Sequence, residues 1–131
     1  LLGSSSLIGK ARRARKILGG AMRQAGVIAA AGLYALEHNV DRLAGDHRNA
    51  ERLAKGLRQL GLHAEQHTNM VFAKVDRPAE LAEHLKKQSV IVLPGPRMRL
   101  VTHLDVDQAG IERALGAFRA FFSPSRAASL S

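Results

Sequence analysis

The sequence contains no cysteine and no tryptophan, and aromatic residues make up only 4% of its 131 residues. The absence of cysteine excludes a disulfide framework and every thiolate metal site. The scarcity of aromatic side chains argues against a surface on which the bases of single-stranded nucleic acid stack. No apolar run approaches the ~18 residues needed to cross a bilayer. The most apolar stretch, residues 25–36, is interrupted by Gly26, Gly32 and Tyr34.

Acidic residues are missing from the first 26 positions. That segment holds six of the 20 basic residues: Lys10, Arg12, Arg13, Arg15, Lys16 and Arg23. The rest of the chain contributes only +3 to the net charge of +9. Such a block suits nucleic acid, an anionic membrane or one small polyanion, and composition does not choose among them. The charge follows the first apolar residues instead of preceding them, so the start does not have the pattern of a secretory signal. We expect a cytoplasmic protein, and the absence of cysteine is compatible with that setting.

Apolar spacing predicts helices in the first half of the chain. Residues 4–18 carry a weak apolar stripe typical of a short basic helix, which Gly19-Gly20 then breaks. A longer helical pattern runs from Met22 to Leu57, and we expect it to bend near His38-Asn39. Gly61 is a good helix stop.

Beyond Gly61 the pattern changes to alternating strands and helices. Strands are predicted at 69–75, 90–93 and 98–103, and helices at 79–88 and after Asp107, where Ile111, Leu115, Phe118 and Phe122 share one face. This order predicts an α/β fold in which helices pack on a short sheet and a helical arm comes first.

The first candidate site is the segment around Gly19-Gly20. Glycines before a helix start leave backbone N–H groups free for an anion, and Arg23 and Lys16 add charge that suits a phosphate. The alternative is a flexible hinge followed by a solvated arginine, because glycine-rich signals are weak without context.

The second candidate is Arg99. If residues 97–103 form a strand, Arg97, Arg99, Val101 and His103 lie on one face, and Met98, Leu100 and Thr102 lie on the other. An arginine in an otherwise apolar strand suits a bound carboxylate, which it holds with two parallel hydrogen bonds. The alternative is that Arg99 pairs with an acid such as Asp105 or extends into solvent.

Other kinds of chemistry have weak support in the sequence. The six histidines lack the spacing of a zinc site, and no arrangement of a serine protease or lipase is present. The basic run at 10–16 leaves open a module that binds nucleic acid or an acidic partner.

Several segments, taken in order, resemble the low-specificity L-threonine aldolases. These are residues 11–16, the Gly-Gly-Ala-Met-Arg-Gln-Ala-Gly stretch at 19–26, residues 29–36, 46–50 and 68–72, and the Arg-Leu-Val-Thr-His-Leu-Asp-Val stretch at 99–106. The third glycine usual in the family's Gly-Gly-Gly-Met-Arg-Gln stretch is Ala21 in this chain.

The resemblance implies the fold type I of aspartate aminotransferase and the cofactor pyridoxal 5′-phosphate. It implies reversible cleavage of L-threonine or L-allo-threonine to glycine and acetaldehyde, in a homo-oligomer built as a dimer of dimers, without nucleic-acid or membrane partners. Residues 1–37 would then close the large cofactor-binding domain, residues 38–122 would form the small C-terminal domain, and residues 123–131 would be a disordered tail.

The resemblance also assigns roles to residues. Arg99 matches the arginine that grips the substrate carboxylate, and Arg23 and Lys16 match basic residues that reach the cofactor phosphate. The lysine that forms a Schiff base with the cofactor is expected about ten residues before Leu1. None of the chain's six lysines has its sequence context, so we expect no catalytic residue in this chain and no aldolase activity from the chain alone.

Overall fold

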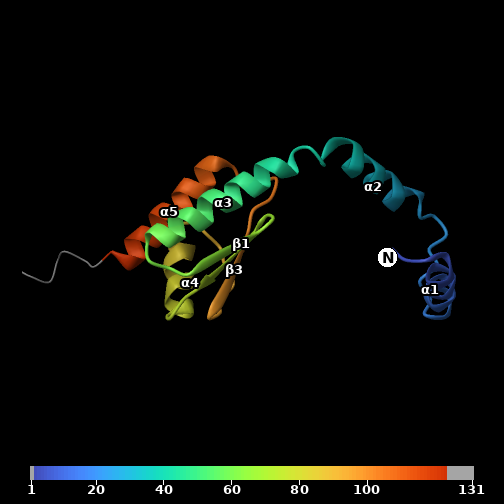
Figure 1. The fold of residues 1–131 in the computed structure, drawn as a ribbon, viewed down its shortest axis with the longest axis horizontal. Coiled ribbons are helices and arrows are strands. Elements are labelled where there is room, and N and C mark those ends of the chain that lie inside the picture. Colours follow the sequence, from blue (N-terminus) through green and yellow to red (C-terminus); the bar gives the residue numbers. More distant parts are fainter. Residues whose placement is uncertain (1, 124–131) are drawn as a thin grey trace, which may run out of the picture. The chain divides into compact units, whose positions relative to one another are not determined.

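The computed structural model describes residues 2–123 and contains five helices and one three-stranded sheet (Figure 1). The α/β class is therefore confirmed. These residues fall into two compact units, the first ending at Val40 and the second beginning at Asp41. The predicted tail, residues 123–131, lies outside the described residues except for Ser123, which caps the last helix. No helix among residues 2–123 is both long and apolar enough to span a membrane.

The first unit consists of two helices, α1 (Ser5–Ile17) and α2 (Gly26–His38). Ser4 caps α1 by accepting a hydrogen bond from the Leu7 amide at 3.3 Å, and the helix closely matches the predicted 4–18. Neither helix buries a side chain. Large apolar residues of α2 are instead open to solvent, for example Val27 at 79% exposure. The unit therefore has no core of its own.

The second unit begins with α3 (Leu43–Gln59), so the long helical pattern is interrupted after His38, where the bend was predicted. Gly61 follows with φ +83°, the left-handed conformation expected of a helix stop. Three antiparallel strands then pair in sequence order: β1 (Ala64–His67), β2 (Met70–Lys74) and β3 (Arg97–Val101). The two remaining helices are α4 (Pro78–Lys87) and α5 (Gln108–Phe122).

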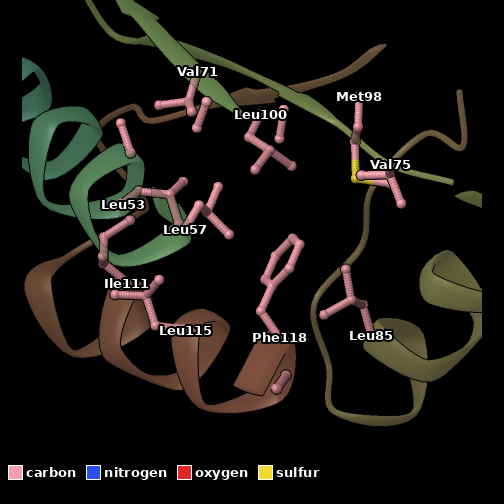
Figure 2. Close-up of a cluster of buried hydrophobic side chains, with 14 of the residues drawn as sticks. Leu53, Leu57, Val71, Val75, Leu85, Met98, Leu100, Ile111, Leu115 and Phe118 are labelled. Atoms are coloured by element: carbon pink, nitrogen blue, oxygen red, sulfur yellow. The ribbon is translucent and has the colours of Figure 1, made fainter. Parts of the chain in front are cut away.

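One face of the sheet carries the core. Val71 and Leu100 point from β2 and β3 toward Leu53 and Leu57 of α3 and Phe118 of α5 (Figure 2). The predicted face of α5 is confirmed, since Ile111, Leu115 and Phe118 are at most 3% exposed and Phe122 is half-buried against the core. Helices α3, α4 and α5 therefore share a single core with the sheet, which leaves the opposite sheet face free to carry polar side chains.

Two strand predictions differ from the structure. β1 was not expected, because Ala-Glu-Gln-His has no β-branched residue; its pairing with β2 overrides local preference. The predicted strand at 90–93 is wrong. The segment alternates between half-buried and exposed side chains as a strand does, but it forms no ladder. Pro94 and Pro96 provide no N–H donors there, and the Val90 amide bonds back to the Leu85 carbonyl at the end of α4.

Gly56 allows α3 and α5 to approach closely. A Cβ at this position would lie 2.6 Å from Cδ1 of the buried Leu115 and nearer still to Cδ2, whereas a Cβ at Gly116 would meet nothing within 4 Å. Gly56→Ala is expected to lower the free energy of unfolding by about 1–2 kcal/mol, because overpacking outweighs the gain in helix propensity. The matched change Gly116→Ala is expected to raise it by up to about 1 kcal/mol. Urea unfolding followed by circular dichroism measures both, and shifts in the same direction would contradict the close contact.

Candidate functional site

Strand β3 presents Arg99 as the sequence predicted. Met98 and Leu100 are buried, and Arg97, Arg99 and Val101 are exposed on the other face. The alternation continues past the strand, with Thr102 buried and His103 exposed. Arg99 therefore stands on the open face of the sheet while its neighbours in sequence are fixed in the core.

A polar junction fixes the carboxyl end of β3. The buried Thr102 hydroxyl donates to the Asp46 carbonyl at 2.7 Å, and the Thr102 amide donates to the Asn69 carbonyl at 2.9 Å. The Asn69 side-chain amide returns a bond to the Thr102 carbonyl at 2.8 Å, and Asn49 donates to the Val106 carbonyl at 2.9 Å. Three stretches noted in the sequence, 46–50, 68–72 and 99–106, therefore meet at one place in the fold. Their shared role is to hold β3.

The acidic member of this junction is held by an arginine. Arg42 donates from Nη1 to both carboxylate oxygens of Asp46 at 3.1 Å, and the Asp46 side chain is only 8% exposed. A carboxylate in the first turn of α3 is also favoured by the helix dipole. The pair with Arg42 holds residue 46 in place, and its backbone carbonyl accepts the hydrogen bond from Thr102.

The open face of the sheet is cationic around Arg99. Arg97 lies over the Phe72 ring, 4.4 Å from its centroid, and donates to Glu65 at 2.9 Å. Arg99 is the register partner of Phe72 but forms no salt bridge among residues 2–123. Asp105, the acid considered as its partner, lies 3.6 Å from His103 instead. The Arg99 guanidinium is therefore left without a protein carboxylate in the described part of the chain.

Arg97 also sets the protonation of its acidic partner. Its hydrogen bond holds the pKa of the Glu65 carboxyl below the ordinary value. Arg97→Ala is expected to raise this pKa toward the ordinary value, and carboxyl NMR titration measures it. Because the folded-state pKa is the lower one, the pair stabilises the fold above the unfolded pKa, and this contribution is lost as pH falls through the folded pKa. Arg99→Ala is the control, and an equal rise in that variant would contradict the assignment to Arg97.

A cavity of about 660 Å³ runs along the free edge of β3. Its walls come from β3 and the segment that follows, from residues 89–95, from α5 as far as Phe118 and from Leu53 of α3. Arg99, His103 and Arg113 line it together with apolar side chains such as Phe118. The cavity is large enough for a small-molecule ligand. Arg113 was not singled out from the sequence, because a single arginine on a helix gives no signal without its neighbours in space.

The other two predicted site residues, Lys16 and Arg23, lie in the first unit and are exposed. The predicted role of the glycines beside them is wrong. The Gly19 amide donates to the Lys16 carbonyl at 3.2 Å and the Gly20 amide donates to the Arg15 carbonyl at 2.8 Å, so both N–H groups cap α1. Because α2 begins only at Gly26, Arg23 also precedes that helix and does not lie in its first turn.

Ala21 replaces the glycine that is usual in the resembled stretch. Its φ is not positive, since Thr68 and Ser89 are the only non-glycine residues with positive φ among residues 2–123. An alanine is therefore accommodated there without backbone strain. Lys16 and Arg23 form no salt bridge in the described chain, so their charges are available to an anion.

Comparisons with known proteins agree with the sequence resemblance. A model of the family described as beta-eliminating lyase matches residues 1–78. The chain is 44% identical over 126 residues to the low specificity L-threonine aldolase of Escherichia coli (strain K12), which covers 94% of this chain and 38% of that protein. It is 38% identical over 130 residues to low-specificity L-threonine aldolase 1 of Arabidopsis thaliana, covering 91% of this chain and 36% of that protein.

A more distant relative carries a different name. The chain is 32% identical over 132 residues to alanine racemase TOXG of Cochliobolus carbonum, covering 90% of this chain and 33% of that protein. In all three comparisons the chain spans between 33% and 38% of the relative's length.

Proposed function

The chain belongs to the beta-eliminating lyase family, and from this premise we propose that it supplies the carboxyl-terminal part of a pyridoxal-phosphate-dependent threonine aldolase. The reaction proposed for the complete enzyme is reversible cleavage of L-threonine or L-allo-threonine to glycine and acetaldehyde. The 44% identity to the E. coli relative supports this choice over the racemase, to which identity is 32%. The observation that carries it is Arg99, whose guanidinium forms no salt bridge among residues 2–123 and stands on a strand that the Thr102 junction holds in place.

The two units support a division of labour within that enzyme. We propose that residues 1–37 belong to the large cofactor-binding domain and that residues 38–122 form the small domain of a fold type I enzyme. The core of the second unit and the lack of a core in the first are compatible with this division. The apolar side chains exposed on α2, such as Ile28 and Leu33, are of the kind that domain or subunit contacts bury. The complete enzyme is proposed to be a cytoplasmic dimer of dimers.

The cationic residues of the first unit fit the cofactor's phosphate. Lys16 and Arg23 are exposed, and no acidic side chain pairs with them among residues 2–123. A guanidinium and an ammonium of this kind would hold a phosphate by charge-assisted hydrogen bonds. When bound, pyridoxal phosphate supplies the electron sink that cleavage of a Cα–Cβ bond requires.

Arg99 has the properties of a carboxylate clamp. Its guanidinium can donate two parallel hydrogen bonds to the α-carboxylate of an amino acid, which fixes the orientation of the substrate as well as its position. Rigid attachment matters for this role, because a clamp that moves by 1 Å loses much of its effect on orientation. Thr102, Asn69 and Asn49 provide that attachment through hydrogen bonds of 2.7–2.9 Å around the end of β3.

A chimera tests the proposed function. The segment of the E. coli K12 relative that aligns with this chain is replaced by residues 1–131, and cleavage of L-allo-threonine is followed through the acetaldehyde released. We expect the chimera to bind the cofactor, seen as visible absorption, and to cleave the substrate. A chimera that folds and takes up the cofactor but releases no acetaldehyde would refute the proposal.

The same assay applied to the 131-residue chain with added pyridoxal phosphate is expected to give no turnover. All six lysines are exposed: Lys10, Lys16, Lys55, Lys74, Lys86 and Lys87. A lysine that reacts with the cofactor is activated by a desolvated or cationic pocket, and these positions provide no desolvation. Turnover by the chain alone would show that one of them has the role we assign to a residue outside this chain.

A further inference from the structure

The cavity beside β3 is unusually rich in positive charge. Four basic side chains line it: Arg97, Arg99, His103 and Arg113. Asp105 is the single acidic side chain in the lining. Two of the four already have acidic partners, since Arg97 donates to Glu65 at 2.9 Å and His103 lies 3.6 Å from Asp105. Arg99 and Arg113 form no salt bridge within residues 2–123. The cavity therefore has two guanidinium groups without a protein counter-charge.

Arg113 lies near the start of α5 and lines the cavity. Its Nη2 would lie 3.6 Å from a Cβ placed on Gly110, so the side chain folds back along the first turn of the helix. Asp107, which precedes the helix, is engaged as its cap and accepts from the Gly110 amide at 2.7 Å. The amino-terminal end of a helix adds positive potential at this wall.

The backbone of β3 adds donors on the opposite wall. The Thr102 amide donates to the Asn69 carbonyl and the Val75 amide donates to the Pro96 carbonyl. The backbone N–H and C=O groups of the even-numbered residues of β3 therefore point toward β2. In an antiparallel ladder the N–H and C=O groups of alternate residues point to opposite sides of the strand, so those of the odd-numbered residues point away from β2. The N–H groups of Arg99 and Val101 therefore point toward the free edge along which the cavity lies.

We propose that this cavity binds a small dianion with two separated carboxylates, one held at Arg99 and the other at Arg113. A monocarboxylate would satisfy only one of the two guanidinium groups and would leave the other uncompensated. In the proposed enzyme, and resting on that function, Arg113 would extend the substrate class to β-hydroxy-α-amino acids with an acidic group at the far end. Dianion binding by the chain itself does not depend on the aldolase proposal.

The test measures binding of succinate and acetate to the 131-residue chain by NMR shifts of the β3 and α5 amides, at constant ionic strength and pH 7. Succinate is expected to bind about tenfold more tightly than acetate, the contribution of one partly exposed charge-assisted contact. Arg113→Ala is expected to reduce the affinity for succinate to that for acetate in the same variant. Arg113→Lys is expected to restore part of the difference, because the charge remains.

Arg119→Ala is the matched control, because Arg119 is also an exposed arginine of α5 but does not line the cavity. It is expected to leave both affinities unchanged. Equal affinities for the two anions in the unchanged chain, or equal losses in Arg113→Ala and Arg119→Ala, would overturn the proposal in favour of general attraction to a basic surface. An inactive chimera with intact succinate selectivity would refute the aldolase function alone.

Discussion

Replacing Arg99 with alanine in the chimera is expected to lower kcat/KM for L-allo-threonine by roughly 30-fold to several thousand-fold. Loss of one partner from a hydrogen-bonded charge pair in a closed site costs about 2–5 kcal/mol, and each 1.36 kcal/mol corresponds to a factor of ten in rate. Most of the loss should appear in KM, because the carboxylate is bound in both the ground state and the transition state. A smaller loss in kcat is expected from the loosened orientation of the substrate.

Arg99→Lys separates charge from geometry in the same assay. Lysine keeps the positive charge but donates as a point charge and lacks the planar fork of a guanidinium. It is therefore expected to recover only part of the activity that alanine loses. If lysine restored full activity, Arg99 would act through its charge alone.

Cofactor absorption distinguishes this role from a structural one. Arg99 is exposed on the open sheet face, so its removal should change neither the thermal stability of the chimera nor its uptake of cofactor. Arg119→Ala, a change to another exposed arginine of the second unit, is the control for loss of surface charge. An equal fall in activity and in cofactor absorption in Arg99→Ala would contradict the clamp.

The direction of Arg99 was predictable from the sequence because the side-chain period of a strand is fixed at two. Alternation from Arg97 to His103 was enough to place Arg99 on the face opposite Met98 and Leu100, and the structure buries the face with Met98 and Leu100. The structure supplied what alternation cannot, the partners of the buried Thr102. Its hydroxyl meets the carbonyl of Asp46, which lies 56 positions earlier in the chain. No local pattern carries a contact over that distance.

The wrong predictions have a common cause in where backbone hydrogen bonds go. Gly19 and Gly20 were predicted to leave their N–H groups free for an anion ahead of the next helix, but these groups satisfy carbonyls of the helix before them. The segment at 90–93 has the composition of a strand, but adjacent prolines remove donors and no ladder forms. In both cases the residue types were informative, and the competition between possible hydrogen-bond partners decided the structure.

Phe118→Ala is expected to cause the largest loss of stability among the changes considered, about 3–5 kcal/mol. Phe118 is 1% exposed and points from α5 toward the sheet, among Leu57, Leu85 and Met98 (Figure 2). Its removal leaves a void that α3, α4 and the sheet cannot all close at once, because each is also held by the others. Since small domains have only about 5–15 kcal/mol in total, this loss would bring the second unit close to unfolding.

Phe122→Ala is the matched control, because it removes the same side chain from the same face of α5. Phe122 is only half-buried and lies at the last position of the helix, so its loss should cost about 1 kcal/mol or less. Urea unfolding of the 131-residue chain, followed by far-ultraviolet circular dichroism, compares the two variants. Equal losses would mean that α5 is held by its end and not by the contact that Phe118 makes with the sheet. That result would also weaken the proposed site, because Arg113 lies on α5 and this helix forms one wall of the cavity.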